Sequence, residues 1–302
     1  MKRCMLAMLV KESFDDKDWI FEIKWDGYRA LAHRDSDVAL LSRNGNSFNA
    51  LFPTITQDLK KLRGPFVFDG EVVILDKKGK ANFQLLQNYQ KSQEGIPYYY
   101  IFDLLSYKGK DLTSLPLMER KSILQKILRK APPSLRFSEH IANKGKLFFR
   151  KAIRLQLEGI IAKKADSTYQ FKRSRDWLKI KNGQRQEVVI GGFTAPRGNR
   201  RRFGALLVGI YRNKKLIYVG HVGGGFNQQL LNTIYQKLLR ITRKKCPFEE
   251  TPSANSPVTW VSPQLVCEVS FAEWTQDGHM RQPIFKGLRI DKPPKEVIKE
   301  SI

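Results

Sequence analysis

Residues 22–29 read Glu-Ile-Lys-Trp-Asp-Gly-Tyr-Arg and place a lysine between two carboxylates at a spacing of two residues. On a β-strand, side chains alternate between the two faces, so Glu22, Lys24 and Asp26 would point to one face. A lysine amine in such a site can act as a covalent nucleophile once it is neutral. The solvated edge of a β-hairpin would show the same alternation, and that alternative stays open on these residues alone.

The segment around Lys24 resembles the K-x-D-G signature of the covalent nucleotidyltransferases, the superfamily of ATP-dependent DNA ligases, RNA ligases and mRNA capping enzymes. The other motifs of the superfamily follow in its order along the chain: Ser42–Gly45, Phe68–Glu71, Ile101–Asp103, Glu158–Lys163, Trp177–Lys181 and Arg289–Lys292. Further stretches look most like the ligase module of bacterial end-joining ligases, namely Met5–Ala7, Arg185–Phe193 and Phe203–Gly209. The resemblance therefore extends over nearly the whole chain.

The resemblance implies a role for each motif residue. Lys24 would be the catalytic nucleophile that attacks the α-phosphate of ATP and carries AMP. Glu22 would contact the adenine, and Phe102 would stack on it. Arg29 and Glu71 would contact the ribose. The other positions that the resemblance assigns to nucleotide binding are Ile23, Arg43, Lys163, Arg173, Lys179, Lys181, Arg289, Asp291 and Lys292.

The same chemistry requires a divalent cation, Mg²⁺ or Mn²⁺. Asp26 and Glu158 are the expected metal ligands, with Glu71 as a further candidate. This set suits Mg²⁺, which takes one or two carboxylates together with water and phosphate oxygens. A lysine has an ordinary pKa of about 10.4, so its attack requires that nearby cations lower this value. We expect Lys179, Lys181 and the metal ion to do so.

The charge of the chain points to a nucleic-acid partner. Its 54 Lys and Arg residues exceed its 29 Asp and Glu residues, which gives a net charge of +25, divided into +15 before and +10 after Gly183. Such an excess favours a polyanionic partner, although a merely soluble basic surface would also produce it. The densest cluster is predicted to bind DNA phosphates in place of the N-terminal DNA-binding domain of larger ligases: Arg197, Arg200, Arg201 and Arg202.

The pattern of apolar residues predicts an α+β adenylation (nucleotidyltransferase) domain over residues 1–183, followed by an all-β OB-fold domain over residues 184–302. In the first half, strand-like and helical segments alternate. The strands are expected at 21–32, 38–42, 66–75 and 98–105, and the helices at 117–130 and 147–157. The second half has short strands around one helical pattern, as small barrels do. These strands are expected at 187–193, 204–211, 216–222 and 265–271, and the helix at 227–241.

Together, these observations predict an ATP-dependent DNA ligase that seals nicks in duplex DNA during repair or end joining. The alternatives are an RNA ligase or a capping guanylyltransferase of the same superfamily, and a non-catalytic OB-containing DNA-binding protein. Nicked double-stranded DNA is the expected partner, and an end-binding repair protein is a further candidate. No segment approaches the ~18 apolar residues of a membrane span. We therefore expect a location in the bacterial cytoplasm. Two separate expectations are that the protein is associated with the nucleoid and that it is a monomer.

Overall fold

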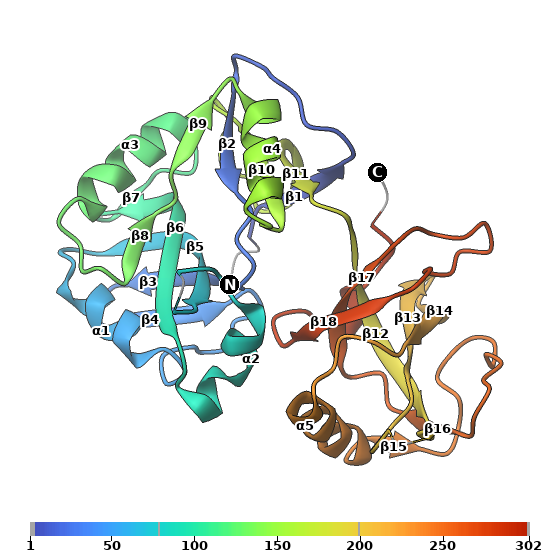
Figure 1. The fold of residues 1–302 in the computed structure, drawn as a ribbon. Coiled ribbons are helices and arrows are strands. Elements are labelled where there is room, and N and C mark those ends of the chain that lie inside the picture. Colours follow the sequence, from blue (N-terminus) through green and yellow to red (C-terminus); the bar gives the residue numbers. More distant parts are fainter. Residues whose placement is uncertain (1–3, 78, 199, 301–302) are drawn as a thin grey trace. The chain divides into compact units, whose positions relative to one another are not determined.

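The computed structural model describes residues 4–77, 79–198 and 200–300 of the chain. These residues form two compact units, of which the first ends at Asn182 and the second begins at Gly183 (Figure 1). Within the described residues, the first unit contains two β-sheets and four α-helices, and the second contains one sheet and one α-helix. None of the helices in these ranges has the length and apolar content needed to cross a membrane.

One sheet of the first unit has the strand order β1-β11-β10-β2-β9. Strands β2, β10 and β11 pair antiparallel, and β1 pairs parallel with β11. One face packs against helix α4 through a core that includes Phe21, Ile160 and Ile180. The opposite face holds the candidate site. The bounds are β1 Leu6–Val10, β2 Trp19–Ile23, β9 His140–Ala142, α4 Gly145–Arg154, β10 Gly159–Lys164 and β11 Arg173–Lys181.

The other sheet of this unit has the strand order β4-β3-β5-β6-β7, and β8 pairs parallel with β6. Its helices α1, α2 and α3 contact β4, β5 and β6 and bury a core that includes Phe68, Ile101 and Leu124. The bounds are β3 Tyr28–Arg34, β4 Val38–Ser42, α1 Pro53–Lys61, β5 Phe66–Leu75, α2 Phe83–Ser92, β6 Ile96–Tyr107, β7 Lys110–Asp111, α3 Leu117–Leu128 and β8 Leu135–Phe137.

The chain passes from the first of these sheets to the second between Lys24 and Gly27. The prediction of one strand over residues 21–32 is therefore wrong, because β2 ends at Ile23 and β3 begins at Tyr28. The physical reason is a close approach at Gly27, where a Cβ atom would lie 2.2 Å from the carbonyl oxygen of Val72 on β5. Strand alternation consequently orients Glu22, whereas Asp26 lies in the connection between the sheets.

This close approach predicts that Gly27→Ala destabilises the first unit. The added methyl group has no room, because Val73 Cγ1 would also lie 2.9 Å from it. We expect a loss of about 1–3 kcal/mol or more in the free energy of unfolding, as overpacking of a filled core typically costs. Urea unfolding measures it, with Gly223→Ala as the control, because a Cβ atom at Gly223 would meet nothing within 4 Å. Equal stability of Gly27→Ala and the wild type would contradict this explanation of the strand break.

The second unit is built around the long strand β12, which pairs antiparallel with β13, β16 and β17. Helix α5 begins after Asn227, whose side chain accepts a hydrogen bond of 2.8 Å from the backbone N–H of Leu230. The bounds are β12 Gln184–Thr194, β13 Leu206–Arg212, β14 Lys215–Val222, α5 Gln228–Leu239, β15 Thr242–Arg243, β16 Val258–Val261, β17 Val266–Phe271, β18 Ile284–Arg289 and the 3₁₀ helix η1 Pro294–Glu296. The strands and the helix predicted for this half overlap observed elements, while β15, β16 and β18 were not predicted.

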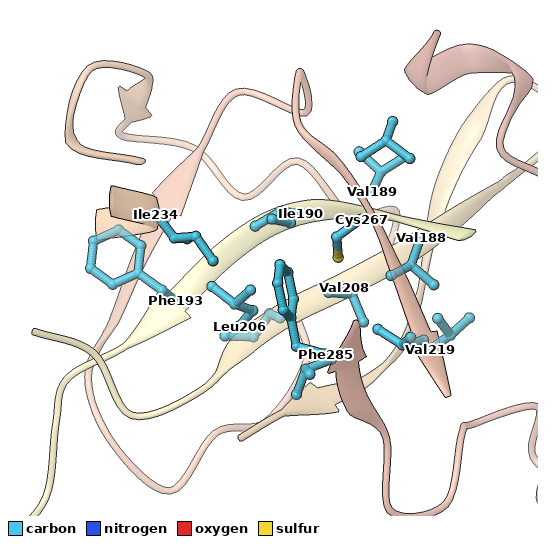
Figure 2. Packing of buried hydrophobic residues seen from close by; sticks show 14 of the residues in the cluster. Val188, Val189, Ile190, Phe193, Leu206, Val208, Val219, Ile234, Cys267 and Phe285 are labelled. Carbon is cyan, nitrogen blue, oxygen red and sulfur yellow. The ribbon is translucent and has the colours of Figure 1, made fainter. Parts of the chain in front are cut away.

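The core of the second unit collects apolar side chains from both faces of this arrangement. Figure 2 shows Ile190, Val208 and Phe285 converging from β12, β13 and β18. Ile234 adds the apolar face of α5 and is fully buried. The core therefore fixes β12, β17 and β18 against one another, and these strands carry Glu187, Glu268 and Arg289.

Candidate active site

Lys24 directly follows β2 and contacts the segment before β10. Its backbone N–H donates a hydrogen bond of 3.0 Å to the carbonyl oxygen of Gly159, and its Nζ lies 2.5 Å from Oε2 of Glu158. The Glu158 side chain is only 4% exposed, whereas that of Lys24 is 21% exposed. The structure thus brings the predicted nucleophile and a predicted metal ligand into direct contact, although 134 positions separate them in sequence.

The turn after Lys24 is held by aromatic packing. The Trp25 ring stacks on Tyr100 of β6 with a centroid separation of 3.7 Å and an interplanar angle of 20°. Trp25 Nε1 also donates a hydrogen bond of 3.4 Å to Oγ of Ser138. These contacts attach the connection between the two sheets to β6, which fixes the backbone that carries the Lys24 amine.

Several of the predicted nucleotide contacts share one face of the β2-β10-β11 sheet. Glu22 lies opposite Ile161, which in turn lies opposite Lys179, so their side chains point to the same side. Lys181 lies opposite Gly159, two positions further along this face. Ile23 lies opposite Ile160 and contributes to the other face of the sheet, so what it can offer a ligand here is its backbone.

Glu22 is the centre of a buried charged cluster. Its carboxylate accepts hydrogen bonds from Lys121 Nζ at 2.7 Å, Lys163 Nζ at 3.0 Å and Ser138 Oγ at 3.1 Å. Burial alone would raise the pKa of Glu22, but the two ammonium groups hold it below its ordinary value. A fixed carboxylate of this kind is suited to accept a hydrogen bond from a base amino group.

Lys163 joins this cluster to two aromatic rings. Its Nζ lies 4.3 Å from the ring centroids of both Phe102 and Trp177. Burial lowers the pKa of Lys163 to about 8, although the neighbouring Glu22 carboxylate opposes that shift. Phe102 is therefore buried, and its ring packs against the Lys163 ammonium group.

Arg29 lies next to the same two aromatic rings, those of Phe102 and Trp177. Its guanidinium group forms a bidentate ion pair with Asp69, at 2.6 and 2.7 Å, and lies 4.5 Å from the Phe102 ring centroid. Tyr169 donates a further hydrogen bond of 2.6 Å to Asp69. Glu71 lies opposite Arg29 in the β3–β5 pairing, so the predicted ribose contacts are neighbours. Asp69 fixes the orientation of Arg29 through the two parallel hydrogen bonds.

Sequence reasoning assigned no role to several residues that hold this site together. Asp69 and Asp103 lie inside quoted motifs, and a closer reading of those motifs could have found them. Asp103 forms a fully buried ion pair with Arg120, at 2.8 Å for both hydrogen bonds, next to Phe102 in the chain. Lys121 and Tyr169 carried no motif signal, because they contribute by contacts that only the fold creates.

The predicted metal ligands are not gathered into a three-carboxylate cluster. Among the residues that the structure describes, no group of three His, Cys, Asp or Glu side chains has a metal-binding arrangement. Asp26, Glu71 and Glu158 therefore do not make a ready site of that kind. Glu158 still offers a hard oxygen donor, and Mg²⁺ bound beside a nucleotide needs only one or two carboxylates.

Arg43 and Arg173 lie at strand ends of the first unit. Arg43 follows β4, and its charge acts on the Cys4 thiol together with those of Arg29, Asp69 and Glu71. Burial raises the pKa of that thiol to about 11. Arg173 begins β11 and donates a hydrogen bond of 2.6 Å to the carbonyl oxygen of Ala7 on β1. This contact ties Arg173 to the parallel strand pair rather than to the Glu22 cluster.

In the second unit, the predicted motif Arg289, Asp291 and Lys292 lies at the end of β18. Arg289 forms a bidentate ion pair with Asp291, at 3.0 and 2.8 Å, and Lys292 pairs with Glu187 of β12. The three side chains are at most 14% exposed. The structure therefore holds these residues in ion pairs within the unit.

Three of the four arginines in the cluster at positions 197, 200, 201 and 202 donate hydrogen bonds inside the second unit. Arg197 donates to Oγ of Ser256 at 2.6 Å, Arg200 to the carbonyl oxygen of Gly223 at 2.7 Å, and Arg202 to Oδ1 of Asn232 at 2.7 Å. Arg201 is exposed. All four arginines were expected to contact DNA phosphates. Three of them already have hydrogen-bond acceptors inside the unit.

Comparison with known proteins places this geometry in a family. A model described as the ATP dependent DNA ligase domain matches residues 4–181, and one described as the ATP dependent DNA ligase C terminal region matches residues 199–292. The multifunctional non-homologous end joining protein LigD of Pseudomonas aeruginosa is 39% identical over 98% of this chain. This chain spans only 36% of that protein's length.

Two other comparisons cover nearly the full length of both chains. A prophage-derived DNA ligase-like protein, LigB of Bacillus subtilis, is 29% identical over 95% of this chain and 98% of its own. A solved structure of mycobacterial DNA ligase D complexed with ATP and MES is 34% identical, with a TM-score of 0.73, and covers 99% of this chain and 98% of its own. Because the family models account for most of its residues, the chain belongs to the ATP-dependent DNA ligase family.

Proposed function

We propose that this chain seals nicks in duplex DNA by way of a lysyl-AMP intermediate on Lys24. The observation that carries the proposal is the 2.5 Å contact between Lys24 Nζ and Glu158 at the K-x-D-G turn of a member of the DNA ligase family. That contact joins two motifs that are far apart in sequence. It is the arrangement expected of a nucleophile beside the group that orients it.

The reaction would proceed in three displacements at phosphorus. The Lys24 amine attacks the α-phosphate of ATP, so a P–N bond forms, the bond to pyrophosphate breaks, and a proton leaves the amine. An oxygen of the 5′-phosphate at a nick then takes AMP from the lysine. Finally the 3′-hydroxyl attacks that activated phosphate, which releases AMP and closes the strand. Each displacement depends on positioning and on neutralising charge at the transferring group.

Different residues of the first unit would bind the adenine, the ribose, the phosphates and the divalent ion. Glu22 would accept a hydrogen bond from the adenine amino group, and Arg29 and Glu71 would bind the ribose. Lys179 and Lys181 would face the phosphates, together with Arg43 in the DNA-bound steps. Glu158 and Asp26 would hold the divalent ion, Mg²⁺ or Mn²⁺, which supplies neutralisation of phosphate charge at this place.

End joining is the repair pathway proposed for this activity, because the LigD relatives carry that description. The second unit is proposed to be an OB-fold domain, which its antiparallel sheet of short strands with one helix supports. The net charge of +25 supports DNA as the partner and the nucleoid as the place of action. An end-binding repair protein as a second partner and the monomeric state stay predictions.

One experiment separates the candidate functions. The protein is incubated with labelled ATP, GTP or NAD, and the products are then chased with nicked DNA or nicked RNA. We expect label on the protein from ATP alone, and its transfer to nicked DNA. Label from GTP would support a capping guanylyltransferase, and sealing of nicked RNA in preference to DNA would support an RNA ligase. No covalent adduct from any donor would leave a non-catalytic DNA-binding protein.

The arginine cluster makes a prediction about DNA binding. Each phosphate contact contributes about 0.9 to the slope of log affinity against log salt concentration on duplex DNA. Arg201 is exposed, so we expect Arg201→Ala to reduce the slope by about one such unit without changing thermal stability. Arg202→Ala should change the slope less, because its Nε already donates to Asn232. An unchanged slope in Arg201→Ala would assign that side chain to a solvated loop.

A further inference from the structure

The cations of the Arg289–Lys292 motif belong to a charged cluster that extends well beyond the motif. It comprises three cations and three carboxylates, all from the second unit: Arg185, Arg289, Lys292, Glu187, Glu268 and Asp291. Asp291 and Lys292 lie just beyond β18, separated from Arg289 by Ile290, and the other members lie on β12, β17 and β18. Their formal charges cancel, so the cluster is neutral as a whole.

Two of the carboxylates lie in an unfavourable position for one another. Glu187 on β12 is the direct cross-strand neighbour of Glu268 on β17. Like charges directly opposite each other destabilise a sheet unless cations compensate them. Here Glu268 is paired with Arg185 at 3.5 Å and Arg289 at 3.3 Å, and Glu187 is paired with Lys292.

These ion pairs hold the two motif cations in place: Arg289 pairs with Glu268 and Asp291, and Lys292 pairs with Glu187. Arg289 uses Nε and Nη2 for Asp291 and Nη1 for Glu268, which sets both the plane and the direction of its guanidinium group. Lys292 has one flexible four-carbon stem, and its anchor is the Glu187 carboxylate. Burial would raise the pKa of Glu187, but Lys292 and Arg289 lower it to about 2, so the anchor stays ionised at neutral pH.

We infer that the cross-strand pair Glu187 and Glu268 positions Lys292 and Arg289 to bind the pyrophosphate portion of ATP. This inference rests on the proposed function, because it assigns the Arg289–Lys292 motif to the leaving group of the first step. Glu187 and Glu268 are positioning residues, since they act through the two cations. Holding the ammonium and guanidinium groups in place before the ligand arrives removes the entropy that their ordering would cost on binding.

Pyrophosphorolysis tests the inference most directly. The adenylated enzyme is mixed with inorganic pyrophosphate, which attacks the AMP phosphorus, breaks the P–N bond to Lys24 and leaves as ATP. We expect Glu187→Gln to raise the KM for pyrophosphate by about five- to tenfold. Sealing of a nick that already carries 5′-adenylate should stay within about twofold of the wild type, because that step uses no pyrophosphate. Glu249→Gln is the matched control, since it removes an equivalent carboxylate from an exposed pair with Lys215 in the same unit.

A double-mutant cycle separates positioning from a general structural role. If Glu187 acts through Lys292, Glu187→Gln should have little further effect on the KM for pyrophosphate in a Lys292→Met background. Independent, additive effects would overturn the inference, as would a folded Glu187→Gln enzyme with the wild-type KM. Glu187→Asp serves if the amide variant does not fold, because it keeps the charge but withdraws the anchor by one methylene group, and it should also raise the KM. A wild-type enzyme that forms no adduct with ATP would instead refute the proposed function itself.

Discussion

Lys24→Ala should abolish transfer of AMP from ATP to the protein, by at least about four orders of magnitude, as removal of a catalytic nucleophile does. The reason is chemical, because no other group in the K-x-D-G turn can form the phosphoramidate. Sealing of a nick with preformed 5′-adenylate should continue at a reduced rate, since its 3′-hydroxyl attacks a phosphate that is already activated. Gel analysis of labelled protein and of labelled nicked DNA measures the two activities separately.

Lys164→Ala is the matched control for this variant. Lys164 is the last residue of β10 and pairs with Asp166 at 3.4 Å on a more exposed surface. We expect the Lys164→Ala variant to be adenylated on Lys24 at the wild-type rate. Loss of sealing on the pre-adenylated nick to the same extent as loss of self-adenylation would show that Lys24→Ala disrupts the site as a whole and would count against a purely nucleophilic role.

The second large effect is expected from Glu158→Ala, which should lower the rate of self-adenylation by about a hundredfold or more. Glu158 is nearly inaccessible and touches the Lys24 amine, so its removal takes away both the orientation of the nucleophile and a donor for the divalent ion. The rate is measured by single-turnover labelling over a range of Mg²⁺ concentrations. Glu119→Gln removes one exposed carboxylate from α3 and should behave as the wild type.

The Mg²⁺ titration distinguishes the two contributions of Glu158. If the carboxylate holds the ion, Glu158→Ala should require more Mg²⁺ than the wild type for half of its maximal rate. If it orients only the amine, the maximal rate falls while that concentration stays the same. Wild-type labelling at low Mg²⁺ would remove Glu158 from the site altogether.

The sequence indicated where the motif residues lie in the fold better than it indicated the residues that pack against them. Residue spacing was sufficient to place Glu22 on one face of a strand, because period-two alternation is a local property of a strand, and Lys24 directly follows that strand. It failed for the strand break at Gly27, because the close approach to Val72 depends on β5, which lies more than 40 positions away. The supporting residues Lys121 and Tyr169 were missed for the same reason, since their partners are distant in sequence.

Helices α1 and α2 show a different limit. Neither was predicted, although α2 begins at a clear cap, where the Asn82 side chain accepts hydrogen bonds from the backbone N–H groups of Gln84 and Leu85. Short helices of this kind are stabilised mainly by packing on the sheet, which local propensity does not reveal. The arginine cluster illustrates the same point for function, because counting charges cannot detect the internal acceptors Ser256 and Asn232.

Mapping the adduct shows directly whether Lys24 carries AMP. The wild-type protein is labelled with ATP, digested and analysed by peptide mass spectrometry under conditions that preserve the phosphoramidate. We expect AMP to be found on Lys24. The competing amine is Lys163, which is buried near the same site with its pKa lowered to about 8. Recovery of AMP on Lys163, or on any lysine other than Lys24, would show that Lys24 is not the nucleophile.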